Sequence, residues 1–135
     1  MTYLQRFTNY LDMKGVKYTV DNEYKLHVSF SADNTSSIVV NVIFDKEGNG
    51  IVRFVVWSIG KFPESKIGAG MVACNELNKK YRWVKFYIDA DDEGCAEMDA
   101  IVDEETAGQE CHELLYRVVN IVDEAYPDIM RALYA

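Results

Sequence analysis

Two consecutive stretches of this chain, residues 38–44 and 51–59, are β-branched or aromatic at nearly every position, interrupted only by Asn41, Arg53 and Ser58. Successive side chains of a strand point to opposite faces of a sheet, so a strand that is apolar at both alternating sets has two faces to bury. The six residues between the stretches include two glycines and an asparagine, which suit a tight hairpin loop. The pair therefore predicts a central hairpin whose second face needs a cover.

That cover can come from a helix of the same chain, from a second subunit or from a bound peptide, and the sequence leaves all three open. Aromatic anchors dominate the binding energy of protein interfaces. If the second face is an interface, we expect the contributing residues to be Val39, Ile43, Val55, Trp57, Trp83 and Tyr87.

The remaining segments divide into helix and strand patterns. Apolar residues at helical spacing mark three helices, at residues 2–14, 63–80 and from about 105 onward. Alternating patterns mark further strands at residues 16–20, 24–31, 83–88 and 95–102. The order α-β-β-β-β-α-β-β-α predicts an α+β domain, in which three helices flank a mostly antiparallel sheet of about six strands.

Several side-chain placements follow from these patterns. On the second helix, one apolar face is expected to hold Ile67, Met71, Cys74, Leu77 and Tyr81. On the last strand, the residues expected to face inward are Ala96, Met98 and Ala100. Glu97 and Asp99, which alternate with them, are expected to face water. In the last helix, Pro127 removes a backbone hydrogen bond, so we expect a kink there or a helix that ends near Ala125 and restarts.

The length of 135 residues fits a single domain that spans residues 1–135 and can bury a core of its own. No apolar run approaches the roughly 20 residues needed to cross a bilayer, and the N-terminus lacks the apolar core of a signal peptide, so we expect a soluble, cytoplasmic protein. The three cysteines, Cys74, Cys95 and Cys111, form no C-x-x-C pair. We expect buried, reduced thiols and not a disulfide framework or a zinc site.

The charge is negative and unevenly distributed. The formal net charge of −8 disfavours nucleic acid and membrane surfaces as partners, because both are bound chiefly through Lys and Arg. Residues 1–82 contain 11 Lys or Arg against 8 Asp or Glu, whereas residues 83–135 contain 3 against 14. This acidic final third is either a solvated helix face and hairpin edge or an interaction surface.

Two loops resemble calcium-binding loops in part. Residues 45–51 offer oxygen donors at loop positions 1, 3 and 5 and a glycine at position 6, but position 12 is Val56 where a bidentate glutamate is needed. The loop of Asp89, Asp91 and Glu93 fails in the same way. Both are predicted to be plain hairpin turns with no metal.

Catalytic motifs receive no support from the sequence. His27 falls on the polar face of a strand, and the consecutive residues Cys111, His112 and Glu113 fan out around a helix instead of converging. Neither phosphate-binding glycine motif is present. We therefore expect no catalytic residues and no cofactor, and a thiol enzyme that uses Cys111 or Cys74 remains the weakest option.

Residues 71–89 contain an N-x-x-N phrase, Asn75 to Asn78, followed by a basic, aromatic turn and a strand. This stretch and the phrase at residues 10–18 resemble the YbjN family, and the order of elements agrees along nearly the whole chain. The family is described as a "putative bacterial sensory transduction regulator" with a fold similar to the type III secretion chaperones. The resemblance implies a bacterial, non-enzymatic, dimeric module that acts through another polypeptide, and it transfers no catalytic residues.

The resulting expectation is a protein-binding regulatory or chaperone-like module whose partner is another polypeptide, with a homodimer expected as well. The alternative is a small-ligand or metal-binding sensor that uses the acidic hairpin around residues 89–94. The two differ in whether calcium or another common metal binds.

Overall fold

The structure is a computed structural model that describes residues 1–35 and 37–135. Its elements follow the predicted order, with one short 3₁₀ turn, η1 (Glu64–Lys66), before the second helix. The helices are α1 (Tyr3–Lys14), α2 (Ile67–Lys80) and α3 (Ala107–Tyr134). The strands are β1 (Thr19–Val20), β2 (Lys25–Phe30), β3 (Ile38–Phe44), β4 (Ile51–Val56), β5 (Lys85–Ile88) and β6 (Gly94–Ile101). The predicted α+β class is confirmed.

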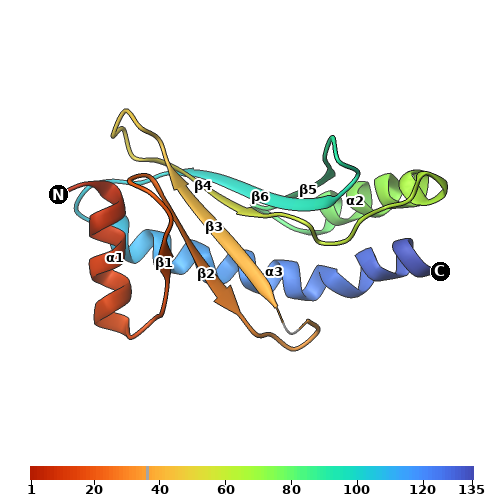
Figure 1. Ribbon diagram of the computed structural model, residues 1–135, viewed down its shortest axis with the longest axis horizontal. Helices are drawn as coiled ribbons and strands as arrows, with labels where there is room; N and C mark the ends of the chain where they lie inside the picture. Colours follow the sequence, from red (N-terminus) through yellow and green to blue (C-terminus); the bar gives the residue numbers. More distant parts are fainter. Residues whose placement is uncertain (36) are drawn as a thin grey trace.

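The six strands form one antiparallel sheet in the order β1-β2-β3-β4-β6-β5. The first four strands form the expected meander, and β6 then pairs with β4 and carries β5 on its other side. The long helix α3 runs along almost the whole length of the molecule, with α1 near one end and α2 near the other (Figure 1).

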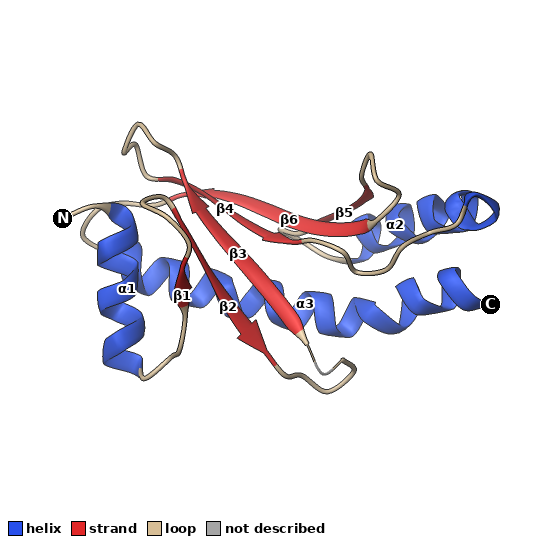
Figure 2. Ribbon diagram, viewed as in Figure 1, coloured by secondary structure: helices blue, strands red, loops and turns tan. Residues whose placement is uncertain are grey.

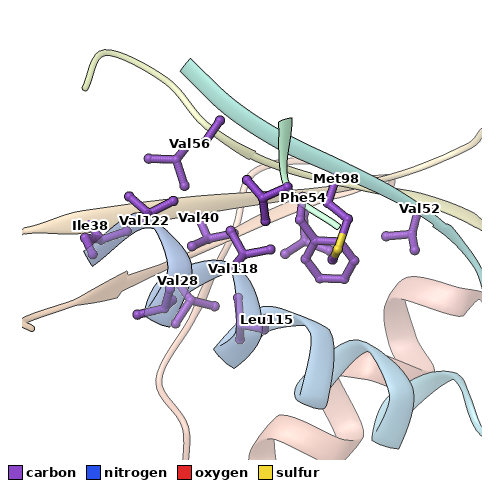
Figure 3. Close-up of a cluster of buried hydrophobic side chains, with 14 of the residues drawn as sticks. Val28, Ile38, Val40, Val52, Phe54, Val56, Met98, Leu115, Val118 and Val122 are labelled. Carbon is purple, nitrogen blue, oxygen red and sulfur yellow. The ribbon is translucent and has the colours of Figure 1, made fainter. Parts of the chain in front are cut away.

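The three helices pack on one face of the sheet, which we call the inner face. Its centre is built from alternate strand residues such as Val40, Phe54 and Met98, which lie opposite Leu115 and Val118 of α3 (Figure 3). At one end α1 joins this layer, where Phe7 meets Phe44 edge to face, and at the other end Cys74 and Leu77 of α2 belong to the same buried cluster. The opposite side of the sheet is the outer face.

Helix α1 begins and ends with strong capping signals. Thr2 and Gln5 form a capping box, in which the Thr2 hydroxyl accepts the Gln5 N–H and the Gln5 side chain accepts the Thr2 N–H. Gly15 ends the helix in the left-handed conformation. Where α1 crosses α3, a Cβ on Gly108 would lie 2.7 Å from the Cβ of Tyr10, so only glycine permits this crossing distance.

Some boundaries and placements differ from the prediction. Strand β4 ends at Val56 instead of residue 59, because the backbone turns at Ser58, whose φ is 60°. On α2, Met71 is 62% exposed and not on the buried face, which holds Gly70, Cys74 and Leu77. The expectation that Met71 lies on the buried face is therefore wrong, while the same expectation for Cys74 and Leu77 is confirmed.

Helix α3 continues through Pro127 to Tyr134, so the expected end near Ala125 is wrong. The proline leaves the Asp123 carbonyl without its helical N–H partner. The Asn34 side chain donates to this carbonyl at 3.0 Å, and the Asp123 carboxylate accepts the Asn34 backbone N–H at 2.8 Å. The carbonyl freed by the proline thus ties the β2–β3 loop to α3.

Candidate functional site

The outer face of the sheet is the candidate functional site. No helix packs on it in the part of the chain that the structure describes, whereas the inner face is covered from end to end (Figure 2). By strand alternation and the observed register, its apolar residues are Val39, Ile43, Ile51, Val55, Trp57, Ile101 and the ring of Tyr87. The outer face is therefore the second apolar face that the sequence of β3 and β4 requires.

Five of the six interface residues expected from the sequence share this face. Val55 is fully buried and Ile43 is half-buried, although the described residues place no other layer above them. Val39 and Trp57, which lie at the same end of this face, are 37% and 43% exposed. These residues form a patch that is dry at its centre and exposed at one end.

The indole of Trp57 lies at the exposed end of this patch. The ring is directed along the sheet toward β2, where the Lys25 Nζ lies 6.0 Å from the ring centre. Beneath this region Asn41 is buried, and its side-chain amide donates to the Val55 carbonyl at 3.3 Å. A buried amide needs such a partner, so the outer face is partly ordered by its own polar contacts.

A charged cluster forms the other half of the outer face. The buried Glu97 accepts a hydrogen bond from Arg53 Nε at 3.0 Å and lies 3.7 Å from Lys85 Nζ. Burial, together with the neighbouring Glu97, raises the pKa of Tyr87 to about 12. The expectation that Glu97 faces water is therefore wrong, because two cations and the Tyr87 ring enclose it, while the inward placement of Met98 is confirmed.

Trp83, the sixth expected residue, lies elsewhere. It sits in the α2–β5 loop with a positive φ of 69°, and the Arg117 guanidinium of α3 lies 4.6 Å from its ring centre. The contact with α3 places it on the helix side of the molecule. Trp83 is exposed, but it is not part of the outer face.

Sequence reasoning missed Ile101, which is 77% exposed on the outer face. The sequence could have indicated this position, because residues 97, 99 and 101 lie on the same face of a strand and Glu97 and Asp99 were expected to face water. The sequence analysis assigned no face to Ile101, so it was not counted with the interface residues.

The second missed feature is the protection of the sheet edge at β5. The Asn78 side chain accepts the Phe86 N–H at 2.7 Å and donates to the Phe86 carbonyl at 3.0 Å. One side chain thus satisfies both backbone groups that a neighbouring strand would use, and it blocks edge-to-edge pairing. Asn78 ends the N-x-x-N phrase, whose purpose the sequence did not reveal.

In the acidic hairpin around residues 89–94, the Asp89 carboxylate accepts hydrogen bonds from the backbone of the turn. Asp89 accepts the backbone N–H groups of Asp91 and Glu93 at 2.8 and 3.1 Å, and the Cys95 thiol lies 3.3 Å from its second oxygen. The Glu93 N–H is the main cause of the lowered pKa of Asp89. Asp89 therefore shapes the turn, as expected for a plain hairpin.

The loop at residues 45–51 is also a hairpin turn. Asp45 accepts the Gly48 N–H, and the Asn49 side chain accepts the Ile51 N–H at 3.1 Å. Within residues 1–35 and 37–135, no group of three or more His, Cys, Asp or Glu side chains is arranged to hold a metal ion.

The cysteines and histidines have structural surroundings. All three cysteines are free and buried, as predicted. Burial raises the pKa of all three thiols, to about 11 for Cys95 and to about 12 for Cys111. Each thiol is therefore held in its unreactive protonated form. His112 packs edge to face against Tyr10 and Tyr116, at ring-centre distances of 5.3 and 4.9 Å. As consecutive residues of a helix, Cys111 and His112 point in different directions.

Among the described residues, none of the helices is both long and apolar enough to cross a membrane.

Comparison with known proteins gives a family and a fold. A family model described as "Putative bacterial sensory transduction regulator" matches residues 4–131. A search of curated proteins found no match. Among solved structures, the chain is similar to YbjN of E. coli, described as "a putative transcription regulator", with a TM-score of 0.67 and 11% identity over 91% of this chain and 87% of that one.

Two further similar structures come from type III secretion. One is the heterodimeric ExoU–SpcU complex of Pseudomonas aeruginosa, with a TM-score of 0.59 and 18% identity over 93% of this chain and 96% of the matched chain. The other is the Yersinia pestis chaperone SycH in complex with a stable fragment of YscM2, with a TM-score of 0.57 and 16% identity over 92% and 97%. At these identities the likeness shows the fold, which is type III secretion chaperone-like.

Proposed function

The chain belongs to the YbjN family, and from this premise we propose that it is a non-enzymatic regulatory or chaperone-like module that holds another polypeptide on the outer face of its sheet. The observation that carries the proposal is the difference between the two faces. Three helices cover the inner face, while the outer face presents Val39, Trp57 and Ile101 to solvent. Exposed apolar side chains on a sheet face that no helix covers, among the described residues, are a candidate protein interaction surface.

The similar structures support a polypeptide partner. The ExoU–SpcU and SycH–YscM2 structures are, by their descriptions, complexes of two different polypeptides. Likeness of fold does not by itself transfer function, so the outer face of this chain must carry the argument. The charged cluster of Arg53, Glu97 and Lys85 beside the apolar patch would give a partner polar groups to orient against.

We further propose that the module works in the bacterial cytoplasm and forms a homodimer when no other partner is present. The apolar residues of the outer face need a cover, and a second copy of the chain can supply one. Multi-angle light scattering at micromolar concentration is expected to give twice the mass of one chain. The mass of a single chain would contradict the dimer.

The binding proposal is tested with a permanently unfolded polypeptide, reduced and carboxymethylated α-lactalbumin, labelled for fluorescence anisotropy. We expect micromolar binding by the wild-type chain and at least a tenfold loss in Ile101→Glu, which places a charge on the outer face. The matched control is Met71→Glu, since Met71 is similarly exposed but lies on α2.

Three results would contradict the proposal. They are the absence of any binding, equal binding by the two variants, or a calorimetric heat with calcium that is lost in Asp89→Asn. The last result would favour the metal-sensor alternative.

A further inference from the structure

The sheet is split between its two central strands. Strand β2 pairs with β3 down to Ile38, but the β3–β4 pairing ends at Asn41 and Val55. Among the described residues, the next positions along, Val39 and Trp57, are not paired with each other. Strands β3 and β4 diverge from there, and α3 passes beneath the space between them (Figure 2).

Strand alternation shows which way the unpaired backbone of Val39 points. The Phe44 N–H donates to the Tyr24 carbonyl on the β2 side, and the Asp45 N–H donates to the Ile51 carbonyl on the β4 side. Neighbouring residues of a strand alternate between its two sides, so Val39, like Asp45, directs its N–H and C=O toward β4. No backbone partner meets them there among the described residues.

A groove of about 470 Å³ occupies this split. Val39 and Trp57 form its rim, and Tyr126, Met130 and Leu133 of α3 form its floor. This volume falls in the range of sites that take a few side chains.

The wall of the groove opposite β3 is formed by residues 58–60, where two residues have the positive φ angles that most residues avoid. Ser58 has a φ of 60° and Gly60 a φ of 125°, and a Cβ on Gly60 would lie 3.2 Å from the Leu133 side chain. Of the described residues that line the groove, Lys61 alone is formally charged, and its Nζ already donates to the Asp91 carbonyl at 2.7 Å. The groove therefore offers an apolar, uncharged floor beside an unpaired stretch of strand.

We propose that this groove receives an extended, uncharged segment of the partner polypeptide, which pairs with Val39 as a short strand and places an apolar side chain on the α3 floor. An extended occupant follows from the unpaired Val39 backbone, because only a strand offers a donor and an acceptor at that spacing. An apolar occupant follows from the floor of Tyr126, Met130 and Leu133. The inference rests on the proposed function and names the site where the partner's chain would enter the sheet.

Amide hydrogen exchange followed by NMR tests the backbone part. In the free protein we expect the Val39 amide to exchange at least 100-fold faster than those of Asn41 and Ile43, which pair with β4. Equal protection of the three amides in the free protein would overturn the inference.

The peptide part is tested with a labelled, end-blocked heptapeptide in which serine and leucine alternate. Its matched control carries N-methyl groups on alternate amides, which keep the side chains and remove the strand hydrogen bonds. We expect the first peptide to bind and to slow Val39 exchange, and the control to bind at least tenfold more weakly. Equal binding of the two peptides would overturn the pairing.

Variants of the floor complete the test. Met130→Glu and Tyr134→Ala change the groove lining, and Tyr134 is exposed enough for its removal to leave the fold intact. We expect at least a tenfold loss of heptapeptide binding in both, with thermal unfolding followed by circular dichroism as the check on folding. Met71→Glu, on α2, is expected to bind as wild type.

The outcomes separate the inference from the proposed function. If α-lactalbumin binding is lost in Ile101→Glu but both floor variants bind the heptapeptide normally, the groove inference is overturned and the proposed function stands. If neither α-lactalbumin nor the heptapeptide binds the wild-type chain, both are overturned.

Discussion

Phe54 and Val55 are neighbours on β4, and both are fully buried, yet they are buried in different ways. Phe54 points into the inner face, on the side of α3 and among a continuous apolar cluster (Figure 3). Val55 points to the outer face. The nearest residues of β4 and its continuation on that face are Arg53 and Trp57, which belong to the sheet side and not to a second layer. One strand thus builds a finished core on one side and a surface that lacks its second layer on the other.

The difference teaches what each face contributes. On the inner face, side chains from two packed layers exclude water, so large free energies of burial hold the fold together. On the outer face, exposed apolar area is left over after folding, and it gains its full burial energy only when another chain covers it. We therefore expect substitutions on the inner face to change stability and those on the outer face to change binding.

The largest effect is expected from Phe54→Ala. Removing a fully buried phenylalanine from the inner face leaves a cavity, so the free energy of unfolding should fall by about 3–5 kcal/mol. Urea denaturation measures it. Ile101→Ala on the outer face is the comparison, with an expected change within about 0.5 kcal/mol. Similar losses in the two variants would show that the faces do not differ in this way.

An intermediate effect is expected at the sheet edge. Asn78→Ala removes both hydrogen bonds to Phe86 and leaves backbone groups at the β5 edge unsatisfied, so stability should fall by about 1–3 kcal/mol. The edge is also opened for pairing, so we expect a rise in higher oligomers by light scattering. Asn75→Ala, in the same phrase and likewise exposed, is the control and should change neither quantity. An unchanged Asn78 variant would show that the edge needs no protection.

The smallest effect is a pH dependence in the helix layer. Burial, with Lys14 nearby, lowers the pKa of His112 between Tyr10 and Tyr116. The neutral imidazole is therefore favoured in the folded state. Its contribution to stability is complete above the unfolded pKa of about 6.5 and is lost as the pH falls below that value toward the folded pKa.

Urea denaturation between pH 5 and pH 7.5 measures this dependence. His112→Phe should flatten it, whereas His27→Gln on the outer face should leave the contribution of His112 in place. An identical pH slope in wild type and His112→Phe would rule out the buried histidine as its source.

The sequence predicted the order of elements and the central hairpin well, because local patterns determine both. The strand at residues 38–44 and the loop after it were placed correctly, because β-branched runs and glycine-rich turns determine the local conformation within a few residues. Helix α3 was found for the same reason. The two-sided apolar pattern of β3 and β4 also predicted a second apolar face, and the need for a cover on that face stays a prediction.

The sequence could not predict features that depend on distant partners. The passage of α3 through Pro127 depends on Asn34, which lies 89 positions earlier in the chain and occupies the freed Asp123 carbonyl. The burial of Glu97 depends on Arg53 and Lys85 from two neighbouring strands. Whether a helix, a second copy or another chain covers the outer face is likewise a tertiary property, so the sequence left it open.

The most direct test of the account is amide NMR mapping of the wild-type chain with reduced, carboxymethylated α-lactalbumin. We expect the shifts to concentrate on outer-face residues of β3, β4 and β6, including Val39, Ile43 and Ile101, while amides in the middle of α1 and α3 remain unchanged. Shifts that concentrate on the helices, or no shifts at saturating polypeptide, would contradict the claim that the outer face is the binding face.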